Sequence, residues 1–150
     1  MTSAQLPDVQ IEIPPRPEYV GVVRHLMGAV ARLGEHSPEL AENAKLAGSE
    51  ACTNAVELTG RAGVDERVEV SAALLGERLE IVVSDRGESA REPGPVKAGA
   101  TDTPAAGFES GLSLPLLEGL VDDLSIEDRE GGGNVVRMVL VGEIDGEDDG

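Results

Sequence analysis

The stretch SPELAENAKLAGSEACTNAVELTG, residues 37–60, decides how we expect the chain to fold. Ser37 is a favourable N-cap, Pro38 suits the first turn of a helix, and acidic residues follow near the positive end of the helix dipole. Apolar residues then continue at helical spacing through Leu46, Ala47, Ala51 and Val56. The pattern predicts a helix from Ser37 to about Gly60 that buries one face in the core.

Two further elements precede this helix. Residues 8–13, DVQIEI, alternate apolar and polar side chains before two prolines, which predicts a strand. From Pro17 to Leu33 an apolar residue recurs every three or four positions, which predicts a helix that Gly34 is placed to end. The apolar positions of this helix are Val20, Val23, Leu26, Met27, Val30 and Leu33.

Strands dominate the second half of the chain. The expected strands are 66–75, 78–84, 123–128 and 134–141. Gly76-Glu77 joins the first two and a run of three glycines joins the last two, and both connections are typical of hairpins. A short helix is expected between the hairpins, over 112–121, begun or kinked near Pro115.

This order predicts one α+β domain over residues 1–142, a two-layer sandwich in which helices cover one face of a mixed, mostly antiparallel sheet. Within it, residues 86–110 are rich in Gly, Pro and Ala and show no period, so we expect a long functional loop, a lid. The tail 143–150 is strongly acidic and is expected to be disordered.

The chain is acidic overall, since 29 Asp and Glu residues against 12 Lys and Arg residues give its 150 residues a net charge of −17. Such a surface repels nucleic acid and anionic membranes, so we expect neither as a partner, whereas a basic protein surface would be attracted. Cys52 is the only cysteine, which excludes an intrachain disulfide and fits a reducing compartment. With no signal-peptide pattern and no apolar run of membrane-spanning length, the protein is expected in the cytoplasm.

Glu50 and Asn54 are the first candidate site residues. They lie four residues apart on the predicted helix and therefore share one of its faces. An amide oxygen can ligate Mg²⁺ without adding charge, and a carboxylate one turn away can take a proton from an attacking hydroxyl. The alternative is an ordinary solvent-facing polar pair, so the pair gains meaning only from its context.

Two later segments supply that context. Asp85 ends an apolar strand, where a carboxylate can accept a hydrogen bond from the exocyclic amine of adenine, and Gly87 lets the backbone approach the ring. Taken alone, an Asp-x-Gly is also an ordinary turn. Backbone N–H groups around Gly111, Leu112 and Ser113 stand where the loop meets a helix, and there they can cradle phosphates or simply cap the helix.

In this order and spacing, the three segments resemble the N, G1 and G2 boxes of the ATPase superfamily that includes histidine kinases, gyrase and heat-shock ATPases. Four stretches more narrowly resemble the anti-sigma factors with serine kinase activity of Gram-positive bacteria: PEYVGVVR (17–24), SEACTNAV (49–56), ERLEIVVSDRGES (77–89) and LLEGLVDDLSI (116–126). The similarity runs from about residue 11 to 141. It implies the Bergerat ATP-binding fold.

The resemblance also implies a function. Members of this family are homodimers that sequester a sigma factor from RNA polymerase and use Mg-ATP to phosphorylate a serine of a STAS-type anti-anti-sigma protein, which drives partner switching. By matching position, Glu50 would be the general base and Asn54 would hold Mg²⁺ with the nucleotide. The other implied nucleotide contacts are Asp85, which would read adenine, and Gly87, Gly111, Leu112, Ser113 and Asn134. Arg24 matches an arginine that contacts protein partners, the alternative being a solvated charge on an amphipathic helix.

Four positions depart from the family pattern. Leu58 stands where histidine is common, Ser89 and Ser113 replace glycines of the G1 and G2 boxes, and Gly133-Asn134 replaces the Gly-Thr that normally opens the final strand. These departures keep a second hypothesis open: a catalytically weak or nucleotide-free partner-binding module of the same fold. A detached histidine-kinase catalytic domain ranks lower, because the chain lacks room for a dimerisation helix bearing a phosphorylatable histidine.

Overall fold

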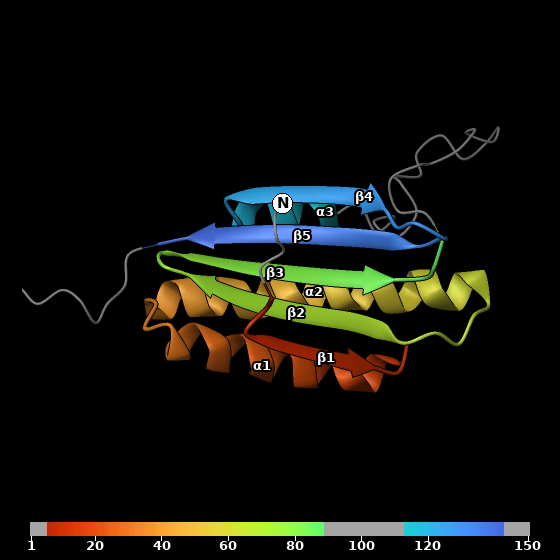
Figure 1. Ribbon diagram of the computed structural model, residues 1–150, viewed down its shortest axis with the longest axis horizontal. Helices are drawn as coiled ribbons and strands as arrows, with labels where there is room; N and C mark the ends of the chain where they lie inside the picture. The colour runs from red at the N-terminus through yellow and green to blue at the C-terminus, as the bar shows by residue number, and fades with distance from the viewer. Residues whose placement is uncertain (1–5, 89–112, 143–150) are drawn as a thin grey trace, which may run out of the picture.

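The protein is a two-layer sandwich, as predicted. The structure, a computed structural model, describes residues 6–88 and 113–142, in which one five-stranded sheet lies against a layer of helices (Figure 1). The α+β class is therefore confirmed. The predicted lid beyond Glu88 and the predicted acidic tail lie outside the described residues.

The sheet brings the end of one central strand to the start of another. Its strands are β1 (Val9–Ile13), β2 (Val68–Leu75), β3 (Arg78–Asp85), β4 (Asp123–Asp128) and β5 (Asn134–Val141). They lie in the order β1-β2-β3-β5-β4, and every neighbouring pair is antiparallel, so the sheet we expected to be mixed is antiparallel throughout the described ranges. Because β3 pairs with β5, Asp85 lies opposite Asn134.

The helices begin and end close to their predicted limits. They are a short 3₁₀ turn η1 (Pro17–Tyr19), α1 (Val20–Leu33), α2 (Pro38–Ala62) and α3 (Ser113–Leu120). Ser37 caps α2, since its Oγ accepts a hydrogen bond of 3.1 Å from the N–H of Leu40. Gly63 ends the helix with φ of 73°, a left-handed conformation that glycine adopts without cost. The last residue of α2, Ala62, lies two residues beyond the expected end at Gly60.

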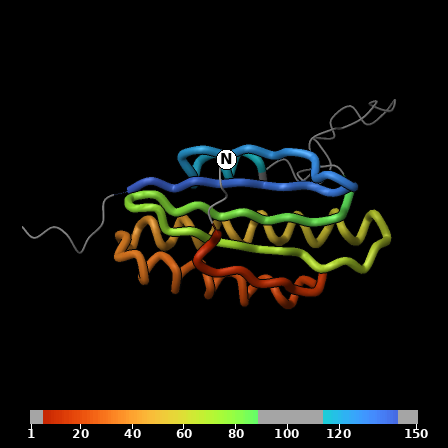
Figure 2. Tube along the Cα trace, in the orientation of Figure 1, coloured from red at the N-terminus to blue at the C-terminus, as the bar shows by residue number. Residues whose placement is uncertain are grey.

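Helices α1 and α2 pack side by side behind the sheet (Figure 2). Gly48 of α2 makes this approach close, because a Cβ atom there would lie 2.7 Å from Cγ of Met27. Met27 and Val23 of α1 are fully buried at this contact, at 0% exposure. The position of α1 on α2 therefore depends on the missing side chain of one glycine.

Aliphatic side chains fill the space between the layers. Alternate residues of the central strands point inward, among them Ile81 and Val83 of β3 and Met138 of β5, and all three are fully buried. Leu58 of α2 and Leu117 of α3 meet them from the helix side. The core is continuous, so the helix that carries Glu50 and Asn54 is fixed against the strand that carries Asp85.

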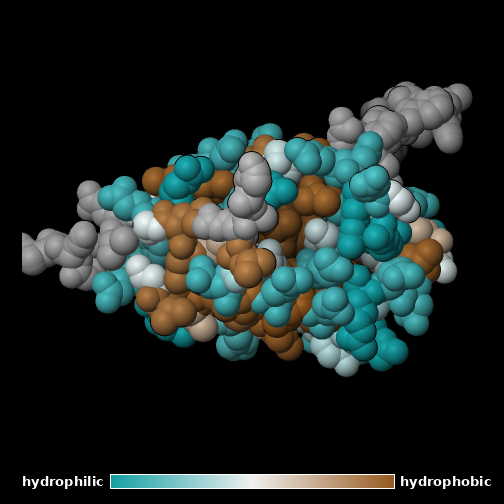
Figure 3. All heavy atoms as spheres, viewed as in Figure 1, coloured by the Kyte–Doolittle hydropathy of each residue, from teal (hydrophilic) through white to brown (hydrophobic). Residues whose placement is uncertain are grey.

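The opposite face of the sheet carries no helix in the described part of the chain (Figure 1). Figure 3 views this face and shows apolar surface over the middle and lower left of the molecule, with polar surface gathered toward the right. A hollow of about 250 Å³ on this side is lined by Ala73, Leu75 and Val82 together with charged residues that include Glu80 and Arg137.

None of the described helices is long and apolar enough to cross a membrane.

Candidate functional site

Asp85 is a buried carboxylate at the end of β3, with 1% of its surface exposed. Its Oδ1 accepts hydrogen bonds from the backbone N–H of Gly87, at 2.7 Å, and from Nδ2 of Asn134, at 3.0 Å. The first bond folds the chain back immediately after the strand, and the second links β3 to the first residue of β5. The carboxylate is thus held by its own turn and by the neighbouring strand.

Burial dominates the ionisation of Asp85. Desolvation raises its pKa above the ordinary aspartate value, because the charged form loses contact with water. The hydrogen bonds from Gly87 and Asn134 and the positive charge of Arg129 act in the opposite direction without cancelling that rise. A further hydrogen-bond donor, such as an exocyclic amino group, would favour the charged form of Asp85.

Gly87 passes directly over the backbone of α2. A Cβ atom at this position would lie 2.5 Å from the amide nitrogen of Thr59 and would also overlap the carbonyl group of Leu58. The next residue, Glu88, donates its N–H to the Leu58 carbonyl at 3.1 Å. Position 87 therefore requires glycine because α2 packs against the turn. This requirement does not depend on nucleotide binding.

Asn54 and Glu50 face different surroundings on α2. Asn54 is buried, with 4% exposure, and within the described ranges its Nδ2 has no hydrogen-bond partner. A buried amide without a partner costs on the order of 1–3 kcal/mol, so the site favours a ligand that accepts from it. Glu50, one turn earlier, is half-buried at the edge of the same helix. The predicted pair is neither in bulk water nor sealed into the apolar core.

Arg24 lies close to this pair although it is far from it in sequence. It is exposed on α1, and its Nη2 lies 3.5 Å from Oγ of Ser49, the residue directly before Glu50. The close packing of α1 on α2 produces this neighbourhood. A protein bound at Arg24 would therefore lie beside Glu50.

Leu58, which stands where the family commonly has histidine, turns its side chain into the core with 2% exposure. It contributes its carbonyl group to the site, through the contact with Glu88. Gly111 and Leu112 lie outside the described residues, and Ser113 is described only as the first residue of α3. The predicted phosphate-binding segment consequently stays a prediction.

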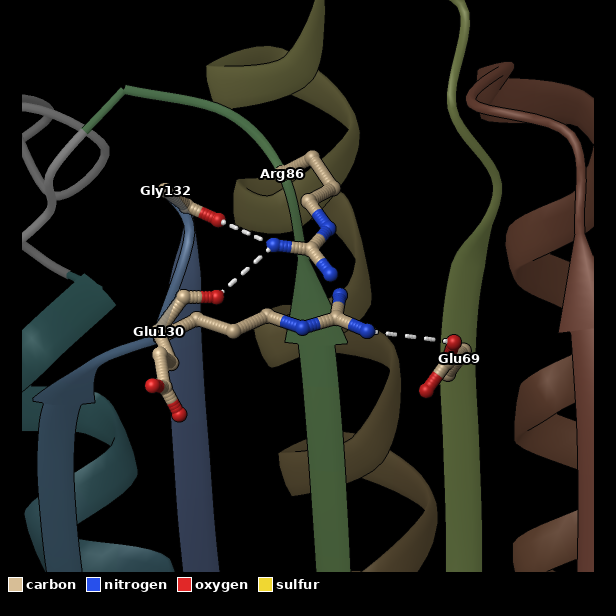
Figure 4. A network of polar contacts seen from close by, with 5 residues as sticks. Glu69, Arg86, Glu130 and Gly132 are labelled. Atoms are coloured by element: carbon tan, nitrogen blue, oxygen red, sulfur yellow. Dashed lines mark hydrogen bonds and ion pairs between the residues drawn. The ribbon is translucent and has the colours of Figure 1, made fainter.

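The sequence did not single out the turn between β4 and β5 as part of the site. Gly131, Gly132 and Gly133 all have positive φ, and a Cβ atom on Gly133 would overlap the carbonyl oxygen of Asp85. Nη1 of Arg86 donates to the carbonyl oxygens of Glu130 and Gly132, at 3.0 Å each (Figure 4). The run of three glycines was the available signal that this turn approaches another backbone closely.

Arg129 and Glu69 complete the network beside this turn. Nη2 of Arg129 lies 3.2 Å from Oε2 of Glu69 on β2, and β3 separates β2 from the strands β5 and β4 in the sheet. Arg129 also contributes the positive charge that lowers the pKa of Asp85. No local pattern predicts this pair, because sixty residues separate its members.

Comparison with known proteins gives one family. Residues 13–140 match the model of the histidine kinase-like ATPase domain. The serine-protein kinase RsbW of Bacillus pumilus (strain SAFR-032) is 37% identical over 132 residues, which cover 82% of this chain and 80% of that protein. RsbW of Bacillus subtilis (strain 168) is 32% identical over 142 residues, covering 90% of this chain and 87% of the relative.

Solved structures share the fold at lower identity. The RsbU and RsbW domains of Rv1364c from Mycobacterium tuberculosis superpose with a TM-score of 0.66 at 21% identity, covering 92% of this chain. The present chain spans only 33% of that longer protein. In the SiaB–SiaC complex of Pseudomonas aeruginosa, the matching chain gives a TM-score of 0.60 at 13% identity and 89% coverage of both chains.

The family model spans most of the chain, and the two RsbW relatives align over at least 80% of their own lengths. The chain therefore belongs to the histidine kinase-like ATPase family and, within it, to the RsbW-like serine-protein kinases and anti-sigma factors.

Proposed function

We propose that this chain is an anti-sigma factor that binds Mg-ATP and transfers the γ-phosphoryl group to a serine of a STAS-type anti-anti-sigma protein. Its family membership implies ATP binding. The observation that carries the proposal is the buried amide nitrogen of Asn54, which has no partner in the part of the chain that the structure describes and lies one helical turn from Glu50. Phosphorylation of the antagonist would leave the sigma factor in the inhibited complex, and the unphosphorylated antagonist would release it.

The two ends of the nucleotide would meet different parts of the fold. Asp85 would accept a hydrogen bond from the 6-amino group of adenine, and the backbone around Gly111, Leu112 and Ser113 would donate to the phosphates. Asn54 would lie between these ends, on the helix against which Gly87 packs. Backbone donors are well suited here, because the net charge of −17 otherwise disfavours an anion.

Asn54 is also the residue proposed to hold Mg²⁺. Magnesium is commonly bound by one or two protein oxygens together with phosphates and water, so one amide oxygen is an adequate protein contribution. The atom that lacks a partner within the described chain is the donor nitrogen Nδ2, which would donate to a phosphate oxygen while Oδ1 holds the ion. When bound, the ion would neutralise phosphate charge.

Glu50 is proposed to take the proton of the partner's serine hydroxyl. As the serine oxygen forms its bond to the γ-phosphorus, the bond from phosphorus to the β,γ-bridging oxygen breaks and ADP leaves with the electron pair. Arg24 would position the partner, because it lies against Ser49, beside Glu50. Its exposure leaves the guanidinium available to a protein surface.

The homodimer is proposed to form through the uncovered face of the sheet. This face combines apolar side chains, including Val82 and Leu75, with charges of both signs, including Glu80 and Arg137, which lie 3.5 Å apart. A second copy related by a two-fold axis could match apolar surface with apolar surface and acidic groups with basic ones. Such an arrangement would leave the helix layer of each copy open to sigma factor and antagonist.

The role of Glu50 can be tested with a Glu50→Gln variant, the purified antagonist and ATP. We expect phosphoryl transfer to serine to fall by about 10²–10⁴-fold, because general base catalysis is lost. The affinity for Mg-ATP, measured by titration calorimetry, should change by no more than about threefold, since the amide keeps the shape of the side chain. Glu57→Gln, an exposed carboxylate on the same helix, is the matched control and should transfer at the wild-type rate.

Undiminished transfer by Glu50→Gln would remove Glu50 from the base role. The second candidate function, a partner-binding module without catalysis, is favoured by the altered positions Leu58, Ser89, Ser113 and Asn134. It predicts no measurable binding of Mg-ATP by the wild-type chain near millimolar nucleotide. Retained binding of the sigma factor in the same preparation would then identify the module.

A further inference from the structure

Asn134 makes two hydrogen bonds with one side-chain nitrogen. The residue is fully buried at the start of β5, with 0% exposure. Its Nδ2 donates to Oδ1 of Asp85 at 3.0 Å and to the carbonyl oxygen of Glu88 at 2.7 Å. Both neighbours are oxygen acceptors, which fixes the orientation of the amide, and the two bonds use both of its hydrogens.

The contact with Glu88 extends to the helix that carries Asn54. Glu88 donates its own N–H to the carbonyl oxygen of Leu58, at 3.1 Å, and Leu58 lies one turn after Asn54 on α2. Asn134 therefore ends a path of hydrogen bonds that runs from β5 through Glu88 to α2. The same amide acts at the adenine end of the proposed site and at the junction with the helix proposed to serve the phosphates.

We infer that Asn134 is a positioning residue that directs the Asp85 carboxylate toward a 6-amino purine and fixes Glu88 against α2. The inference rests on the nucleotide-binding function proposed above. Guanine also carries hydrogen-bond donors, its N1–H and 2-amino groups, so a carboxylate free to rotate could accept from either purine. A carboxylate whose direction is fixed by Asn134 together with the N–H of Gly87 accepts from adenine and meets the 6-oxo group of guanine unfavourably.

The family's threonine could not do both tasks, because a hydroxyl has a single hydrogen to donate. It would donate to the carboxylate rather than to the Glu88 carbonyl, since hydrogen bonds to charged acceptors are stronger. Asparagine at this position therefore adds the contact with Glu88 to the contact with Asp85. A threonine variant would therefore keep the contact with Asp85 and lose the contact with Glu88.

The test compares Asn134→Ala and Asn134→Thr with the wild-type chain, with Asn43→Ala on α2 as a control distant in sequence from Asp85 and Glu88. Calorimetric titrations give the affinities for Mg-ATP and Mg-GTP, and amide hydrogen exchange without nucleotide gives the protection of the Glu88 N–H. For Asn134→Ala we expect ATP affinity to fall about tenfold or more, since a buried hydrogen bond to a charged group is lost. The preference for ATP over GTP should fall as well, and Glu88 should exchange faster.

For Asn134→Thr we expect ATP affinity and purine preference to return to near the wild-type values while Glu88 still exchanges fast. If Asn134→Ala does not fold, the threonine variant alone decides. Near wild-type ATP affinity with fast exchange of the Glu88 N–H in Asn134→Thr supports the inference, and wild-type protection of the Glu88 N–H in that variant overturns it. Wild-type affinity and purine preference in a folded Asn134→Ala would also overturn it, even if exchange or melting temperature changed. Failure of the wild-type chain to bind either nucleotide would instead overturn the proposed function on which the inference rests.

Discussion

At the scale of single residues, the buried charge of Asp85 has two opposite effects. It lowers the stability of the free protein, and it is the group proposed to bind the adenine of the nucleotide. Its pKa is raised by desolvation, so the folded chain holds this proton more tightly than the unfolded chain. This proton stabilises the folded state. The stabilisation is complete when the pH is below 3.8, the ordinary pKa of aspartate, and it is lost as the pH rises through the raised pKa of Asp85 in the folded chain. At neutral pH the free protein therefore bears the cost of a buried charge.

The substitution Asp85→Asn should have effects of opposite sign on these two properties. Without nucleotide, the variant should melt at a higher temperature than the wild-type chain at about pH 7, and the difference should shrink as the pH is lowered toward the ordinary aspartate value of 3.8. Its affinity for Mg-ATP should fall about 10–100-fold, because an amide nitrogen replaces an acceptor for the adenine amine. Differential scanning fluorimetry across this pH range and calorimetry measure the two effects, and Asp123→Asn, an exposed aspartate, is the control. Wild-type affinity in Asp85→Asn would show that Asp85 does not read the base.

At the scale of the elements, the contact between α1 and α2 determines where Arg24 lies relative to Glu50. This contact is close because Gly48 has no side chain where Met27 packs. Met27 is fully buried, so it has little room to yield to an added methyl group. The distance between the two helices, and with it the proposed partner surface, should be sensitive to this position.

We expect Gly48→Ala to lower the free energy of unfolding by about 1–3 kcal/mol, even though alanine is the better helix former. Urea denaturation followed by circular dichroism measures the change. Gly60→Ala, on the same helix with nothing within 4 Å of the added atom, should instead raise the free energy of unfolding by about 0.5–1 kcal/mol. Equal effects of the two substitutions would show that helix propensity, and not packing against Met27, decides the outcome.

At the scale of the whole molecule, the two faces of the sheet have different tasks. The inner face is covered by the helices, whereas the outer face carries apolar surface beside polar surface (Figure 3), and its hollow is lined by apolar and charged side chains together. Exposed apolar surface of this kind commonly marks a contact with another protein. The net charge of −17 on each chain opposes self-association, so a dimer through this face needs that apolar area.

We predict that the wild-type chain sediments as a dimer and that Val82→Glu converts it to a monomer without changing its helix content. The substitution would place a charge of the same sign on both copies in the middle of the contact. Leu33→Glu, on an exposed residue of α1, is the matched control and should remain dimeric. Raising the salt concentration should tighten the wild-type dimer by screening the repulsion between the chains. A dimer that persists in Val82→Glu would exclude this face as the contact.

The sequence by itself determined the elements and the types of residue at the candidate site. Periodicity and capping are local properties, so the limits of α1, α2 and the two hairpins could be predicted from spacing, as could the two layers. The candidate pair of Glu50 and Asn54 followed from the same local argument, because residues four apart share a helix face.

Only the tertiary structure decided what surrounds those residues. Three features depend on contacts between segments far apart in the chain. They are the Asn54 Nδ2 that lacks a partner among the described residues, the bonds from Asn134 to Asp85 and Glu88, and the contact of Arg24 with Ser49. The reason that Gly87 must be glycine also came from the structure, since the backbone of α2 occupies the space of its side chain. Packing between layers joins residues across long sequence separations, and no local pattern records which of them will meet.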